Sequence, residues 1–155
     1  RRVDVLGRRP EQAALTAAMG ADAFLVGAHP SPAAPDRAYD LVVVAAGGVD
    51  AVSAARSAVR RGGTVVVVGF SGRGRTFALG IDDLVNDDVA LVGSYAYTRD
   101  SWSSVVRRLG SDLSDLGVLV THRFPLERHA EALAAVRGAA GLRGKVVLDP
   151  VHPAT

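Results

Sequence analysis

The sequence predicts an α/β fold with a doubly wound parallel sheet. Two apolar, β-branched runs at 41–45 and 64–68 are each followed closely by glycine, and a helix-length segment separates them. Such runs are typical of strands buried on both faces in a parallel sheet. Strands and helices alternate over about ninety residues, which indicates right-handed βαβ units.

The sequence of residues 3–26 predicts two strands with one helix between them. The apolar residues of 3–6 form the first strand. Pro10 suits the first turn of a helix, and Gly20 suits its C-cap. Residues 23–26 form a second short strand, and three prolines indicate an irregular surface connection over 27–37.

The rest of the chain continues the alternation. Val52, Ala55 and Val59 share one face of a helix predicted over 50–60. Asp100 begins a later helix, whose apolar face includes Trp102. The remaining predicted elements are strands at 41–45, 64–68, 89–92 and 144–148, an extended segment at 118–124, a helical turn at 82–86 and a helix at 126–136.

The composition limits the classes of protein to consider. Apolar residues make up 48% of the 155 residues, which excludes a disordered chain. The absence of cysteine excludes disulfides, thiolate metal sites and cysteine nucleophiles. The net charge of +2 comes from dispersed arginines and favours no nucleic-acid partner. Because there is no membrane-length apolar run and no signal-peptide pattern, we expect no membrane partner. A cysteine-free α/β chain fits a cytoplasmic location.

Mostly small residues stand where two neighbouring strands end. They are Ala45, Ala46 and Gly47 at one end, and Val68, Gly69 and Phe70 at the other. A glycine lets a flat ligand lie close to the backbone, at the carboxyl edge where open α/β sheets bind ligands. The pattern indicates a nucleotide-binding sheet. The alternative interpretation is that these glycines only end strands and form turns.

Further motifs follow one another in a fixed order. They are RPEQ and MGAD within 9–22, YDLVVVAAGG at 39–48, RGGTVVVVG at 61–69, GSYAY at 93–97, THRFPL at 121–126 and GKVVL at 144–148. In this order they resemble the C-terminal half of the medium-chain dehydrogenase/reductase family, which includes the zinc-type alcohol, polyol and threonine dehydrogenases. The resemblance covers nearly the whole chain.

The resemblance implies a Rossmann-type fold. It also implies an NAD(P)-dependent oxidoreductase that transfers hydride between a nicotinamide cofactor and a small alcohol or carbonyl substrate. Family members carry the first strand, its Gly-rich turn and the catalytic zinc ligands ahead of the matched segment. We therefore expect a fragment that is inactive alone, with an incomplete dinucleotide-binding domain at 1–96. Residues 97–155 would pack on an N-terminal catalytic domain, where any zinc would lie.

Two other functions stay open. One is a zinc-free relative that reduces quinones or enones, and the other is a non-catalytic module that binds a nucleotide. Cysteine and histidine zinc ligands in the N-terminal domain would distinguish a zinc enzyme from the zinc-free reductase. Turnover by the full-length protein would distinguish an enzyme from the non-catalytic module. The sequence also leaves open whether the protein forms a homo-oligomer.

The resemblance assigns cofactor contacts to several positions. It places Ala45, Ala46 and Gly47 beside the adenosine half of the cofactor, Val68, Gly69 and Phe70 beside the nicotinamide, Ser94 and Tyr95 at the exit of the next strand, and Lys145 facing the pyrophosphate. A lysine suits a phosphate because it is a point cation without demanding geometry. The alternative for Lys145 is a surface lysine at the start of a strand.

Gly7, Arg8 and Arg9 follow the first predicted strand. Rossmann folds carry an acidic residue near this strand end, where it binds the ribose 2′-hydroxyl of NAD. Here a glycine leaves room, and two guanidinium groups suit a 2′-phosphate through charge-assisted hydrogen bonds. We predict NADP as the cofactor, with NAD as the alternative. The other interpretation is a solvated arginine pair at the start of a helix.

No metal ligand or catalytic residue is predicted in this chain. The four histidines, His29, His122, His129 and His152, lack the spacing of a metal site. The aspartates within 82–88 fit helix-end and turn roles better than a calcium loop. No nucleophile elbow is present for a serine hydrolase.

Overall fold

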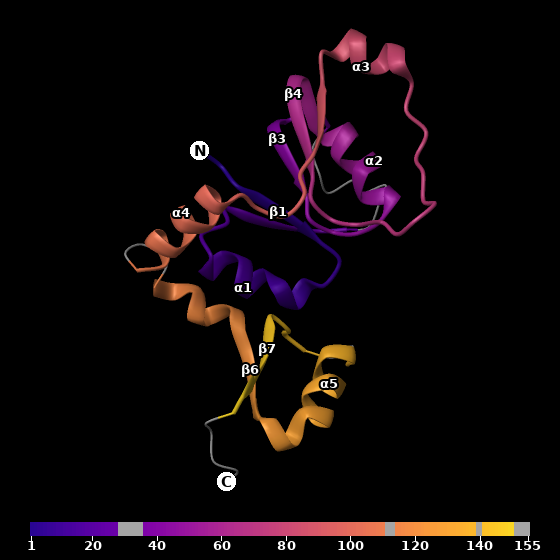
Figure 1. Cartoon of the computed structure of the whole chain (residues 1–155). Helices are drawn as coiled ribbons and strands as arrows, with labels where there is room; N and C mark the ends of the chain where they lie inside the picture. The colour runs from indigo at the N-terminus through magenta and orange to yellow at the C-terminus, as the bar shows by residue number, and fades with distance from the viewer. Residues whose placement is uncertain (28–35, 111–113, 139–140, 151–155) are drawn as a thin grey trace. The chain divides into compact units, whose positions relative to one another are not determined.

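The computed structural model describes residues 1–27, 36–110, 114–138 and 141–150 (Figure 1). His29, His152 and most of the predicted connection at 27–37 lie outside the described residues. The chain forms two compact units, which we call the terminal unit (Arg1–Val26 with Arg99–Thr155) and the central unit (Gly27–Thr98). The predicted division at residue 96 concerns the domains of a longer protein and stays a prediction.

A three-stranded parallel sheet forms the centre of the central unit. Its strands are β3 (Tyr39–Val44), β4 (Val59–Val67) and β5 (Ala90–Gly93), in that order. The helix α2 (Val49–Ala58) connects β3 to β4, and α3 (Ile81–Asp87) precedes β5. The register aligns Val42, Val65 and Leu91 across the sheet. The predicted α/β fold with parallel strands is confirmed.

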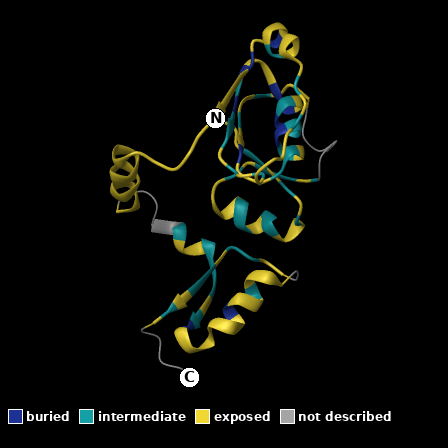
Figure 2. Ribbon diagram, turned by 45° about the vertical axis from the view of Figure 1, so that its right-hand side comes forward, coloured by how far each residue is buried: buried dark blue, intermediate teal, exposed yellow. Residues whose placement is uncertain are grey.

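The core of the central unit lies between α2 and one face of the sheet (dark blue in Figure 2). Its buried residues are Val44, Val52, Ala55, Val59, Val65 and Val89. Val59 and Val65 are fully buried, and burying a valine side chain stabilises a fold by roughly 1.5–3 kcal/mol. The small and branched side chains that the composition supplies thus form the contact between helix and sheet.

Helix α2 ends earlier than predicted. The expected helix over 50–60 stops at Ala58, and Val59 already belongs to β4. Val59 joins the strand because its side chain fills the core, and this burial outweighs the helical pattern. The strand β4 then bends at Gly62, whose φ of 68° is a conformation that glycine adopts without strain.

The opposite face of the sheet carries no helix within the described central unit. Leu41 and Val43 of β3 are each 56% exposed. Val43 is level with Val66 of β4 and Val92 of β5 on this face. The prediction that both faces are buried is therefore wrong for these residues. An apolar run shows that a strand suits burial, but it does not show which chain segment covers each face.

A carboxylate clamp joins the amino ends of the strands. Asp87 is a buried carboxylate at its centre. Arg37 donates to its two oxygens, with Nη1 to Oδ1 at 2.8 Å and Nη2 to Oδ2 at 3.1 Å. Arg56 of α2 also donates to Oδ2, and Nε of Arg61 lies 3.8 Å from Oδ1. Hydrogen bonds from Arg37 and Arg56 lower the pKa of Asp87 to about 2.

Replacing Asp87 should make the chain less stable at neutral pH and less sensitive to acid. Asp87→Asn leaves the arginines without their charged partner, so its melting temperature should fall at pH 7. The folded-state pKa of Asp87, about 2, lies below the ordinary value of 3.8. Its contribution is therefore complete above about pH 4 and is lost as the pH falls toward 2. Thermal unfolding, followed by circular dichroism at several pH values between about 4 and 2, should show that the melting temperature falls more steeply with decreasing pH in the wild type than in Asp87→Asn.

The neighbouring aspartate offers a matched control for this experiment. Asp88 is exposed and has a φ of 52°, a conformation that asparagine also tolerates. Asp88→Asn should follow the wild-type acid profile. Parallel profiles for the wild type and Asp87→Asn would contradict the clamp.

The terminal unit begins with a parallel strand pair. Strands β1 (Asp4–Gly7) and β2 (Ala23–Val26) are connected through η1 (Pro10–Gln12) and α1 (Ala13–Ala18). Gly20 follows the helix with a φ of 85°, in agreement with its predicted role as helix terminator. Val3 N donates to the Asp22 carboxylate at 2.6 Å, and Asp22 N donates to the Val3 carbonyl at 2.8 Å. These bonds hold the starts of the two strands together.

A second parallel pair lies in the C-terminal part of this unit. Its elements are α4 (Arg99–Leu109), η2 (Ser114–Leu119), β6 (Val120–Pro125), η3 (Leu126–Arg128), α5 (His129–Arg137) and β7 (Lys145–Asp149). β6 pairs with β7, and α5 contacts both (Figure 1). The segment predicted as extended from 118 starts only at Val120, because a 3₁₀ helix precedes it. Gly144 N donates to Thr121 Oγ1 at 3.0 Å, which fixes the strand starts.

Helix α4 is amphipathic but has no buried residue. Its predicted apolar face exists, yet Trp102, Val105 and Val106 remain substantially exposed. Neither α4 nor any other helix in the described residues is long and apolar enough to cross a membrane.

The 155-residue chain should self-associate when it is purified alone. Among the described residues, β1 pairs only with β2 and β3 pairs only with β4, so each has one unpaired edge. Unpaired strand edges and exposed apolar faces promote contact with other chains. Sedimentation velocity over a range of concentrations should therefore show species larger than a monomer.

A substitution on the uncovered face should reduce this association. Val43→Thr keeps a β-branched side chain suited to a strand while making the face more polar. Val85→Thr is the control, because Val85 of α3 is also exposed but lies outside the sheet. A concentration-independent monomer, or equal effects of the two variants, would argue against association through the sheet.

Candidate nucleotide-binding site

Three strand ends form one edge of the central unit. Because β3, β4 and β5 are parallel, residues 45–47, 68–70 and 94–95 all follow carboxyl ends. Val68 N and Gly69 N donate to the Val44 carbonyl at 3.0 and 3.1 Å, and Ser94 N donates to the Val67 carbonyl at 2.9 Å. The structure thus brings together the predicted strand-end residues of the central unit. Such an edge is where open α/β sheets bind ligands.

Two glycines at this edge are required by contact between turns. A Cβ at position 69 would lie 2.7 Å from the Ala45 carbonyl oxygen and 2.8 Å from the Ala46 carbonyl carbon. A Cβ at position 47 would overlap the carbonyl oxygen of Phe70. Only glycine therefore lets the 45–48 turn pack against residues 69–70. This reason differs from the predicted one, which was close approach of a ligand to the backbone.

An exposed pair of aromatic rings stands beside the turns. Phe70 and Tyr95 are 79% and 83% exposed. Their ring centroids are 6.0 Å apart, and the ring planes meet at 77°, which is an edge-to-face arrangement. Exposed rings next to a strand edge offer a surface on which a flat heterocycle can stack. That these rings contact a cofactor, as the resemblance implies for Phe70 and Tyr95, stays a prediction.

The predicted Gly7, Arg8 and Arg9 lie in the terminal unit. Gly7 ends β1, and a Cβ there would lie 2.7 Å from Cζ of Phe24 in β2. The space beside this glycine is thus occupied by the Phe24 ring. Arg8 is exposed and Arg9 is half-buried. Among the residues that the structure describes, neither guanidinium has an ion pair or hydrogen bond.

Lys145 also lies in the terminal unit, on a different sheet from Gly7. It is the first residue of β7, and its side chain is exposed. Its carbonyl accepts a hydrogen bond from Thr121 Oγ1 at 3.4 Å. The side chain is available to an anion. The role that the resemblance gives it, toward the pyrophosphate, stays a prediction.

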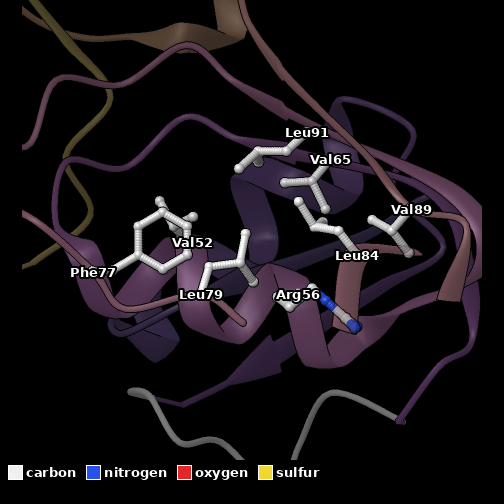
Figure 3. Close-up of a pocket in the computed structure, with 8 residues that line it drawn as sticks. All are labelled: Val52, Arg56, Val65, Phe77, Leu79, Leu84, Val89 and Leu91. Carbon is white, nitrogen blue, oxygen red and sulfur yellow. The ribbon is translucent and has the colours of Figure 1, made fainter. Parts of the chain in front are cut away.

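A small apolar pocket in the central unit lies away from the strand ends (Figure 3). Val65 and Leu91 line it side by side from neighbouring strands, Phe77 lies beside Val52, and Arg56 lines one side. Its volume is about 10 Å³, which is room for a single water molecule at most. Nε of Arg56 is buried and has no acceptor among the described residues. The pocket is a packing gap in the core and is far too small for a cofactor.

Sequence reasoning missed Ser71. Its Oγ accepts a hydrogen bond from Gly48 N at 3.2 Å and so links the turn after β3 to the turn after β4. The sequence places Ser71 only in a loop rich in glycine and arginine. The signal that could have found it is its position directly after Phe70, at a strand end already predicted to be functional.

The described residues do not form a zinc site. No group of three or more histidine, cysteine, aspartate or glutamate side chains in this part of the chain could hold a metal ion. The chain also has no cysteine. These side chains therefore do not fit a catalytic or structural zinc.

Comparison with known proteins identifies the family. Residues 2–111 match the family model of the zinc-binding dehydrogenases, which is more than half of the chain. The chain belongs to the zinc-binding dehydrogenase family. Sorbitol dehydrogenase of Macaca fascicularis is 31% identical to it over 111 residues, which cover 72% of this chain and 30% of that protein. Sorbitol dehydrogenase of Gallus gallus is 32% identical over 110 residues, or 70% of this chain and 30% of that protein.

Solved structures show the same fold. A dehydrogenase from Escherichia coli in complex with NADH has a TM-score of 0.81 and 18% identity, over 96% of this chain and 44% of that one. A zinc-binding dehydrogenase from Sinorhizobium meliloti bound to NADP has a TM-score of 0.74 and 22% identity, over 96% of this chain and 45% of that one. The predicted family resemblance and Rossmann-type fold are confirmed. The chain spans about 30% of the length of its sorbitol dehydrogenase relatives.

Proposed function

We propose that this zinc-binding dehydrogenase chain is the cofactor-binding part of an NAD(P)-dependent enzyme that acts on an alcohol, a polyol or the corresponding carbonyl compound. The observation that carries the proposal is the strand edge with its exposed Phe70–Tyr95 pair, in a chain of this family. Its relatives are sorbitol dehydrogenases, and proteins of the same fold contain NADH or NADP. Both findings support a nicotinamide cofactor.

The chain's own contribution would be to bind and orient the cofactor. Bound nicotinamide would supply the hydride acceptor or donor for the carbinol or carbonyl carbon of the substrate. Phe70 and Tyr95 would hold the flat nicotinamide ring at the sheet edge, and the 45–47 turn would form the wall beside the adenosine half of the cofactor. Lys145 would pair with the pyrophosphate. Groups that bind the substrate and move its proton, and any zinc, are proposed to lie on parts of the protein outside this chain.

The first test compares the isolated chain with the full-length protein. We expect the full-length protein to reduce NAD(P) with a panel of alcohols and polyols, and the 155-residue chain to show no turnover. One wall of a catalytic site cannot position both reactants. Absorbance of the reduced nicotinamide follows the reaction. Turnover by the isolated chain would refute its assignment as a cofactor-binding part only, and cofactor binding without turnover in the full-length protein would support a non-catalytic module.

The second test concerns the choice of cofactor. We expect the full-length protein to prefer NADP over NAD, because Arg8 and Arg9 can donate to a 2′-phosphate and no acidic residue stands at Gly7. A hydrogen bond to a charged group contributes about 1.5–3 kcal/mol, which corresponds to roughly a tenfold to hundredfold preference. Arg8→Ala and Arg9→Ala should reduce the ratio of kcat/KM with NADP to kcat/KM with NAD.

The control for this test is another exposed arginine. Arg108→Ala removes a charge from α4 and should leave the cofactor ratio unchanged. Preference for NAD in the wild type would show that the strand end does not select the phosphate. A ratio unchanged by both Arg8→Ala and Arg9→Ala would show that these side chains are surface charges.

A further inference from the structure

Two turns at the candidate site are joined by one side chain. Ser71 is half-buried, and its Oγ accepts the hydrogen bond from Gly48 N, 23 residues earlier in the chain. Gly48 is the N-cap residue of α2 and, as a glycine, has no side chain that could cap the helix. The hydroxyl of Ser71 thus connects the loop after β4 to the N-cap of α2. Ser71 directly follows Phe70, one of the two exposed rings.

Burial does not set the orientation of the Phe70 ring. The ring is largely exposed, so few neighbours restrict it, and its edge-to-face contact is with the equally exposed Tyr95. Its backbone, in contrast, is closely held. Gly69 N donates to the Val44 carbonyl, and the Gly47 backbone packs against the Phe70 carbonyl. The direction in which the ring leaves the sheet edge therefore depends on the contacts of residues 69–71.

We propose that Ser71 is a positioning residue, which holds the 45–48 turn against Phe70 and so orients the Phe70–Tyr95 pair toward the flat ring of the cofactor. This inference rests on the proposed function of the site. Without the hydroxyl, Gly48 N loses its acceptor, and the turn can move away from the Phe70 carbonyl. Phe70 and Tyr95 are then both still present, but their rings are no longer held in one orientation.

The experiment uses the full-length protein and three serine variants. Ser71→Ala removes the hydroxyl, Ser71→Thr retains one, and Ser53→Ala is the control. Ser53 lies in α2 of the same unit, where its Oγ donates to the Val49 carbonyl at 3.2 Å. Fluorescence titration with NADPH gives the dissociation constant. We expect Ser71→Ala to weaken binding about threefold to tenfold, the typical effect of one hydrogen bond, while Ser71→Thr and Ser53→Ala bind like the wild type.

A second readout separates positioning from general stability. The chain also contains Tyr39 and Tyr97, so the part of the near-ultraviolet tyrosine dichroism that Tyr95→Phe removes is the signal that reports the asymmetry around Tyr95. This part should weaken in Ser71→Ala without cofactor. The melting temperatures of Ser71→Ala and Ser53→Ala should be similar. If Ser71→Ala does not fold, Ser71→Cys, whose thiol is only a weak acceptor for Gly48 N, should reproduce the loss of binding.

The outcomes distinguish this inference from the proposed function. Unchanged binding and dichroism in Ser71→Ala, or an equal effect in Ser53→Ala, would overturn the positioning role. Failure of the wild type to bind NADPH and NADH would instead refute the proposed function. In that case the dichroism of Ser71→Ala still tests whether the hydroxyl orients the rings.

Discussion

The contact between α2 and the sheet fixes the positions of the strand ends. Val52 and Ala55 of the helix lie in one cluster with Val44 of β3 and Val65 of β4. A slip of one residue would turn the fully buried Val65 outward and place Thr64 or Val66 against the helix, so burial specifies the register of β4. The turns after β3 and β4 are therefore brought side by side by the core. Their mutual contacts, including the one that requires Gly69, follow from this alignment.

The sequence alone predicts which strand ends meet, but not what they touch. Parallel strands place 45–47 and 68–70 at one edge, and this follows from the apolar runs and the helix between them. The contacts of Gly47 with Phe70, and of Gly7 with Phe24, join residues 23 and 17 positions apart in the numbering of the chain. No local pattern reports such contacts. The same limit explains the boundary of α2, because the burial of Val59 depends on the strands around it.

The clamp around Asp87 shows this limit most clearly. From the sequence, the aspartates within 82–88 fit helix ends and turns, and α3 does end at Asp87. The arginines that donate to this carboxylate come from 50 and 31 residues earlier in the chain. Charged side chains scattered over the sequence thus converge at one point in the fold. The arginines are dispersed in the sequence, which argues against a nucleic-acid partner. Two of them, Arg37 and Arg56, stabilise the fold by binding Asp87.

The two edges of the central sheet consequently differ in charge. The amino edge carries Arg37, Arg56 and Arg61, each of which forms an ion pair with Asp87. The strand-end residues of the carboxyl edge, 45–48, 68–71 and 94–95, include no charged residue, and the nearest arginines, Arg73 and Arg75, follow in the loop after Ser71. A neutral edge with two exposed rings suits the flat, uncharged part of a dinucleotide, whereas phosphates require cations. In the proposed function the cations are Lys145 and the Arg8–Arg9 pair, all of which belong to the terminal unit. The charges that stabilise the fold are thus distinct from those that are proposed to select the ligand.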